Sequence, residues 1–295
     1  MKDKKLIFDG VATALITPFS DGQIDYGALG MLIDMQIDGG IDALVICGTT
    51  GESSCLSDEE KLALFEFTVA RAEGRVPVIA GVGCSDTEKT VKMCRAARER
   101  GANALLIVTP YYNRPTAKGL YLHYRACAEA SDIPIIAYNV PPRTGVSIPT
   151  ATLAELLRDG YIDSVKEASG DLSRTAEIIS SCDGLTVYSG NDDQTLPTAA
   201  LGGRGVISVV SNIFPREMTE MYRTFRRGEH EAAAEMQRKL TPVEHAIFSE
   251  VNPLGIKYAA SLLGICRSEF RLPMCEPTEP TKEKIKRAID RFCKN

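Results

Sequence analysis

The chain has 295 residues, 44% of them hydrophobic, and a formal net charge of -5 at pH 7. This length allows one large core or two modest domains. The charge is small, and no stretch of the sequence concentrates Lys and Arg between aromatic side chains, which argues against a nucleic-acid partner.

The N-terminal segment does not predict a targeting signal. Residues 1–5 are charged or polar apart from Met1, and the apolar run that follows is short and contains Asp9 and Gly10. Such a run is too short and too interrupted for a signal peptide or a membrane span. We therefore expect a cytoplasmic protein without a membrane partner.

Cysteine and histidine spacing indicates no metal site. The nine cysteines include no Cys-x-x-Cys pair, and the three histidines are isolated from one another in the sequence. Zinc sites and disulfide frameworks are both recognised by regular spacing, which is missing here. We expect reduced thiols and no bound metal.

Short apolar runs alternate with longer amphipathic segments from the N-terminus to about residue 210. Continuous apolar and β-branched runs are typical of strands buried on both faces. The runs lie at 11–17, 43–47, 77–82, 104–109, 133–139, 162–166, 185–189 and 205–210. The segments between them predict helices at 25–38, 57–73, 86–100, 116–130, 149–158, 172–181 and 193–201. Ser57 and Glu60 form a capping box at the start of one of these helices.

This alternation predicts an α/β fold, a (β/α)8 TIM barrel, because strand–helix–strand units pair in parallel with right-handed crossovers. The alternative is an open doubly wound sheet. Such a sheet typically has a glycine-rich turn after its first strand, where this chain has Thr17-Pro18-Phe19.

After residue 210 the pattern becomes helical, at 216–227, 229–249, 253–263 and 281–292, and no flexible linker precedes it. We expect a catalytic barrel over residues 1–214. Residues 215–295 are expected to form a C-terminal helical extension packed on the barrel.

Lys166 is the sharpest functional candidate. The carboxyl ends of barrel strands share one mouth, and Lys166 ends the run 162–166. The two-residue alternation of a strand places residues 162, 164 and 166 on one face. If that face lines the interior, burial favours a neutral amine, which is the form that attacks a ketone. The alternative is an exposed or ion-paired lysine beside Glu167.

Other strand ends offer binding groups. Thr49 and Thr50 lie between two glycines, so the backbone there can approach a ligand and direct N–H groups at a carboxylate. Tyr112 and Tyr138 can relay protons, because a phenol both donates and accepts. Arg143, in the turn 141–145, can hold a guanidinium toward a carboxylate. Taken singly, each has an ordinary structural alternative as a turn, a buried tyrosine or a solvated arginine.

As an ordered set, these motifs resemble the dihydrodipicolinate synthase and N-acetylneuraminate lyase superfamily, which consists of pyruvate-handling class I aldolases. The resemblance spans nearly the whole chain. It is carried by residues 10–14, 48–53, 110–113, 138–141, 143–145, 166–171, 189–190, 205–208, 252–253 and 271–273.

The resemblance implies roles for individual residues. It places the Schiff-base lysine at Lys166, a proton relay at Tyr138, Thr49 and Tyr112, and the pyruvate-carboxylate loop at Thr49 and Thr50. Backbone positions near the nucleophile fall on Gly190 and Ile207. The second tyrosine of the family's tyrosine pair enters a neighbouring subunit's site, so Tyr112 implies a homo-oligomer, expected to be a tetramer of two tight dimers.

The resemblance also implies a reaction. Pyruvate and L-aspartate 4-semialdehyde would condense to 4-hydroxy-tetrahydrodipicolinate, a step of diaminopimelate and lysine biosynthesis, without a cofactor. Arg143 favours this lyase over the alternatives, N-acetylneuraminate lyase and 2-keto-3-deoxy sugar acid aldolase, because their polyhydroxylated substrates suit an arginine-bearing turn poorly. A non-catalytic binding barrel would be expected to lose Lys166 or the tyrosines.

One prediction concerns regulation. Synthases that L-lysine inhibits hold it with histidines and a glutamate around positions that are Asp58, Lys61 and Lys89 here. Two cations would face the ammonium group of the ligand, and Asp58 with nearby Glu88 offsets that repulsion only in part. We therefore predict weak or absent inhibition by L-lysine. Half-inhibition of the purified enzyme at submillimolar L-lysine would contradict this.

Overall fold

Eight parallel strands form a closed barrel in the computed structural model, which describes residues 6–294. Their order around the barrel is β1-β10-β9-β8-β7-β6-β5-β4, with β1 paired to both β10 and β4. This confirms the expected (β/α)8 architecture. The strands are β1 (Gly10–Ala14), β4 (Ala43–Ile46), β5 (Val78–Gly81), β6 (Ala104–Val108), β7 (Ile135–Asn139), β8 (Ser164–Glu167), β9 (Thr186–Ser189) and β10 (Gly205–Ser208).

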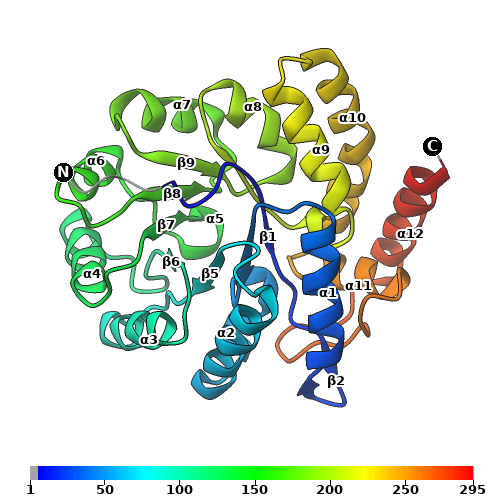
Figure 1. Cartoon of the computed structure of the whole chain (residues 1–295), viewed down its shortest axis with the longest axis horizontal. Helices are drawn as coiled ribbons and strands as arrows, with labels where there is room; N and C mark the ends of the chain where they lie inside the picture. The colour runs from blue at the N-terminus through cyan, green and yellow to red at the C-terminus, as the bar shows by residue number, and fades with distance from the viewer. Residues whose placement is uncertain (1–5, 295) are drawn as a thin grey trace.

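Helices follow the strands in chain order and surround the barrel, except for the short α5, which lies beside β7 within the ring of strands in this view (Figure 1). They are α1 (Tyr26–Asp38), α2 (Asp58–Ala72), α3 (Thr87–Glu99), α4 (Ala117–Glu129), α5 (Pro141–Thr144), α6 (Thr150–Arg158), α7 (Leu172–Ser181) and α8 (Thr195–Ala200). The predicted capping box is present: Ser57 accepts from the Glu60 N–H, and the Glu60 side chain accepts from the Ser57 N–H.

Several short elements escaped sequence prediction. The strands β2 (Phe19–Ser20) and β3 (Gln23–Ile24) form a small antiparallel hairpin. Helix α5 occupies the predicted turn at 141–145, and single 3-10 turns follow several strands: η1 (Thr49–Gly51), η2 (Ser53–Cys55), η3 (Asp192–Gln194) and η4 (Val210–Asn212). Elements of two to four residues are shorter than the repeats on which hydrophobic periodicity depends.

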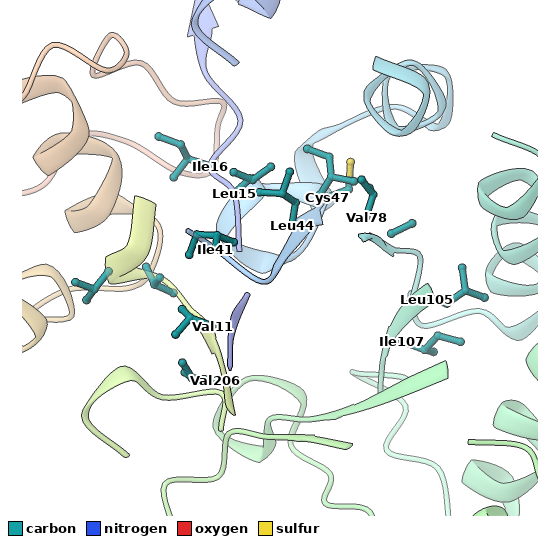
Figure 2. Packing of buried hydrophobic residues seen from close by; sticks show 14 of the residues in the cluster. Val11, Leu15, Ile16, Ile41, Leu44, Cys47, Val78, Leu105, Ile107 and Val206 are labelled. Atoms are coloured by element: carbon teal, nitrogen blue, oxygen red, sulfur yellow. The ribbon is translucent and has the colours of Figure 1, made fainter. Parts of the chain in front are cut away.

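The strands separate two hydrophobic regions because their side chains alternate between the two faces. The larger cluster lies between the barrel and its helices and includes Val11, Leu44, Leu105, Ile107 and Val206 (Figure 2). The alternate positions fill the barrel interior with small or apolar side chains and two tyrosines: Ala12, Ala14, Ala43, Val45, Ile79, Ala104, Leu106, Ile136, Tyr138, Tyr188 and Ile207.

One detail of the predicted alternation is wrong. Strand β8 begins at Ser164, and Ser164 pairs with Ile136 of the interior cluster, on the same face as Lys166. Ile162 precedes the strand and packs in the outer cluster instead. Ile162 lies two residues before the first residue of β8, so the period of two does not reach it.

The C-terminal helices are α9 (Pro215–Arg226), α10 (His230–Ile247), α11 (Leu254–Leu262) and α12 (Glu279–Lys294). Helix α9 packs on β1, and α10 contacts both α9 and α12. These helices, yellow to red in Figure 1, cover one flank of the barrel beside α1. Between residues 6 and 294, no helix has both the length and the apolar character needed to cross a bilayer.

Glu244, buried on α10, gives a prediction about stability. Burial and, to a smaller extent, the charges of Asp192 and Asp193 raise its pKa from 4.5 to about 8. Between pH 4.5 and about pH 8, Glu244 keeps its proton in the folded chain and has released it in the unfolded chain, so the free energy of unfolding falls as the pH rises. We predict that Glu244→Gln removes this loss and raises the unfolding free energy by about 3 to 5 kcal/mol near pH 9, with little change near pH 5.

Urea unfolding of the parent and the variant at several pH values measures this difference. Glu235→Gln is the matched control, because Glu235 is exposed on the same helix and its pKa is lowered by the side chain of Lys239. A stability difference for Glu244→Gln that did not change with pH would contradict the prediction.

Candidate active site

Lys166 lies in the barrel interior near the carboxyl end of β8. Its Cα pairs with Tyr138 on one side and Tyr188 on the other, and only 5% of the residue is exposed. Its Nζ lies 4.5 Å from the centroid of the Tyr138 ring. Within residues 6–294, no ion pair or hydrogen bond engages this amine. Lys166 is therefore a buried, unpaired amine.

Glu167 does not pair with Lys166, because the alternation of β8 directs it to the opposite face. Its carboxylate accepts from Asn139 Nδ2 at 2.9 and 3.1 Å and from Arg174 Nε at 3.2 Å. The backbone N–H of Ser169 donates to the same group at 2.7 Å. The ion-paired alternative for Lys166 is thus excluded, since the neighbouring acid is already occupied.

Gly190 leaves room for the lysine side chain. A Cβ atom at this position would lie 3.0 Å from Cε of Lys166 and 2.5 Å from Cβ of Ala168. Ile207 is fully buried in the same interior cluster, with Tyr138 and Tyr188. Both residues therefore shape the surroundings of the amine.

The Thr49–Thr50 pair forms the 3-10 turn η1 after β4. Thr17, at the end of the first apolar run, donates from Oγ1 to the Gly51 carbonyl at 2.7 Å. Thr50 is buried, and its Oγ1 accepts from Asn252 Nδ2 at 3.0 Å. The turn is held both from the barrel and from the C-terminal extension.

A cavity of about 270 Å³ opens beside this turn, and Thr49 and Arg143 are among the residues that line it. Lys61 contributes a second cation, and the lining contains no carboxylate. A smaller adjoining space is lined by Thr49 and Tyr138. The larger cavity can therefore attract an anionic ligand, although the Lys61 amine also lies 3.7 Å from Asp58 Oδ1.

Arg143 and Thr50 share a neighbour. The guanidinium Nη2 of Arg143 donates to the Asn252 carbonyl at 3.1 Å, while the Asn252 side chain donates to Thr50. Asn252 was not predicted as a site residue from the sequence. Its only sequence signal is the Asn-Pro pair that contributes to the family resemblance, and that signal gives no indication of its contacts.

Tyr112 lies apart from the other candidates. Its side chain is exposed, with 91% of the residue accessible, and its backbone has a φ of +72°. It lines neither of the two spaces beside η1. In the single chain, Tyr112 is therefore not brought together with Lys166.

Asp192 was also missed by sequence analysis. It is buried after β9, where its Oδ2 accepts from the backbone N–H groups of Val209 and Val210 at 3.0 and 3.3 Å. Burial raises the pKa of this carboxyl, and the charge of Lys166 acts in the opposite direction. A single aspartate in a strand–turn–helix connection has no spacing signal that would have identified it.

Comparison with known proteins identifies close relatives. The model of the dihydrodipicolinate synthetase family matches residues 7–292. The 4-hydroxy-tetrahydrodipicolinate synthase of Syntrophus aciditrophicus is 45% identical over 287 residues, covering 97% of this chain and 99% of that protein. The crystal structure of dihydrodipicolinate synthase from Aquifex aeolicus superimposes with a TM-score of 0.95 at 42% identity, covering 97% of this chain and 98% of that one.

A third relative bears on assembly. A structure described as a monomeric dihydrodipicolinate synthase variant has a TM-score of 0.95 and 39% identity, covering 97% of both chains. The fold is therefore found in at least one relative described as monomeric.

The packing around Gly190 predicts the effect of a single methyl group. Gly190→Ala would place a Cβ 2.5 Å from Cβ of Ala168, which no side-chain rotation can relieve, and 3.0 Å from Cε of Lys166, so both the backbone and the lysine must shift. We predict that the rate at which pyruvate and borohydride modify Lys166 falls at least about tenfold, because small displacements of reacting groups are costly. Intact mass spectrometry follows the modification.

Gly30→Ala is the control. It lies in helix α1, and an added Cβ there would have no contact closer than 3.5 Å. A parental rate of modification in Gly190→Ala would show that the glycine does not shape the lysine's surroundings.

Proposed function

The chain belongs to the dihydrodipicolinate synthetase family, and from this premise we propose that Lys166 is the nucleophile of its active site. The protein is a lyase that condenses pyruvate with L-aspartate 4-semialdehyde in diaminopimelate and lysine biosynthesis. The sugar-acid alternatives are not favoured by these relatives. The observation that carries the proposed role is the buried amine of Lys166, which has no carboxylate partner among residues 6–294.

The first step is the attack of the neutral Lys166 amine on the ketone carbon of pyruvate. The carbinolamine formed in this way takes up a proton, which we assign to the Tyr138 relay, and loses its hydroxyl as water, which leaves a protonated imine. A carboxylate beside the amine would favour the ammonium form and slow the attack. The engagement of Glu167 by Asn139 and Arg174 supports the proposal, because it removes the carboxylate next to Lys166 in the sequence as a partner.

Pyruvate's carboxylate is proposed to bind at Thr49 and Thr50. The turn lies beside a space that Thr49 shares with Tyr138, so a keto acid held there has its ketone close to the lysine. The iminium withdraws electrons from the methyl group, and loss of one methyl proton gives an enamine. We assign the transfer of this proton to Tyr138, whose ring already contacts Nζ of Lys166.

Arg143 is proposed to bind the carboxylate of the aldehyde substrate. It lines the larger cavity together with Thr49, and that cavity has no acidic residue. The enamine carbon attacks the aldehyde, and the aldehyde oxygen takes up a proton. The substrate's own amine then replaces Lys166 at the imine carbon, which closes the ring and frees the enzyme without a cofactor. Gly190 and Ile207 are assigned to the surroundings of the lysine.

Oligomeric assembly is part of the proposal. The exposure of Tyr112 suits a residue that completes the proton relay with Tyr138 and Thr49 in a neighbouring subunit. We propose a homotetramer of two tight dimers, located in the cytoplasm. We likewise propose residues 1–214 as the catalytic barrel and 215–295 as the extension.

The function is tested by supplying purified protein with pyruvate and L-aspartate 4-semialdehyde, beside cleavage assays with N-acetylneuraminate and 2-keto-3-deoxygluconate. We predict turnover of the first pair alone. Borohydride with pyruvate should add one reduced pyruvyl group at Lys166. Condensation that proceeds while Lys166 stays unmodified by borohydride would overturn the proposed mechanism.

Two variants serve as controls. Lys166→Ala should abolish the adduct and lower turnover by orders of magnitude, because the covalent route is lost. Arg143→Ala should form the adduct normally and lose use of the aldehyde substrate. If Arg143→Ala impaired only pyruvate binding, the assignment of the aldehyde site would be wrong.

A further inference from the structure

We propose that Lys257, in the C-terminal extension, is a positioning residue for pyruvate binding. It holds Glu52, the residue that follows the Thr49–Thr50 turn, and so fixes the conformation of that turn. This inference rests on the proposed function, because it assumes that the turn receives pyruvate's carboxylate.

The backbone at Glu52 needs support. Glu52 has φ and ψ angles of 53° and 36°, which is the left-handed conformation that non-glycine residues rarely adopt. It forms the joint between η1 and η2. Because this conformation is unfavourable for a glutamate by itself, contacts of its side chain must stabilise it.

The side chain of Glu52 is fully engaged by the C-terminal part of the chain. Oε1 accepts from Nζ of Lys257 at 2.5 Å, and Oε2 accepts from the backbone N–H of Arg271 at 3.2 Å. Both side chains of the Glu52–Lys257 ion pair have 0% exposure. The extension therefore holds both oxygens of one carboxylate at the base of the turn.

The other neighbours of the Lys257 amine are aromatic rings. Its Nζ lies 4.0 Å from the centroid of the Phe19 ring and 5.2 Å from that of Phe270. Burial lowers the pKa of Lys257, while the charge of Glu52 acts to raise it. A buried ion pair often contributes no more to stability than apolar side chains of the same size, so its retention is better explained by the conformation that it specifies.

The two residues before Glu52 are held by other parts of the chain. Thr17 holds the carbonyl of Gly51, and Asn252 holds the hydroxyl of Thr50. With Lys257 on Glu52, three successive residues of the turn are each fixed by a different partner. Loss of this anchor leaves Glu52 free to leave the left-handed conformation, which reorients the N–H groups of the turn before it.

The test compares Lys257→Met with the parent in the full-length protein. We expect the KM for pyruvate to rise about tenfold, since the turn is misplaced, with the KM for the aldehyde changed less than about twofold. The pyruvate concentration that half-saturates borohydride trapping at Lys166 should rise in parallel. A variant whose melting temperature falls while both pyruvate readouts stay parental would overturn the proposal.

A double variant separates positioning from stability. Lys257→Met with Glu52→Gln removes both buried charges, while the amide oxygen can still accept from the Arg271 N–H. We expect its melting temperature to exceed that of Lys257→Met, because no unpaired carboxylate remains buried. Its KM for pyruvate should nevertheless stay raised; a return to the parental value would refute the positioning role. This variant also carries the test if Lys257→Met does not fold.

Lys282→Met is the matched control. Lys282 also lies in the extension, pairs with Glu276 and Glu279 at 2.6 and 2.9 Å, and lies 5.7 Å from the Tyr258 ring centroid. It should leave both KM values unchanged. Failure of the proposed function is recognised separately, because the parent protein would then not condense the two substrates. Pyruvate trapping, compared between the parent and Lys257→Met, would still report on the turn.

Discussion

A lysine amine held out of water without a carboxylate partner is the constraint on which the site depends. Lys166 satisfies it because the interior of a parallel barrel is closed on all sides by strands. The neighbours follow from this requirement: an aromatic ring at Tyr138, and no side chain at all at Gly190.

The buried acids near the barrel mouth are arranged so that none forms a pair with this amine. Glu167 binds Arg174 and Asn139, Glu52 binds Lys257, and Asp192 accepts two backbone N–H groups. Each carboxylate thus has its own donors. The three carboxylates therefore stabilise the loops, while the Lys166 amine is left to react as proposed.

The C-terminal helices contribute to the site as well as to the core. Asn252 and Lys257 reach the turn after β4, and Arg271 reaches both Glu52 and Glu60. Since Asn252 also contacts Arg143, the extension connects the turns proposed to bind the two substrates. The barrel alone would leave these turns without the anchors that the extension supplies.

The sequence by itself determined the barrel and most of the candidate residues. Strand periodicity and the polar ends of apolar runs are local properties, so they identified the eight strands, Lys166 and the Thr49–Thr50 pair. Only the tertiary structure decided how the extension meets these residues, because the Asn252–Thr50 and Lys257–Glu52 contacts join positions 202 and 205 residues apart. No local pattern specifies a contact across that separation, since it exists only after the last helices fold back onto the mouth.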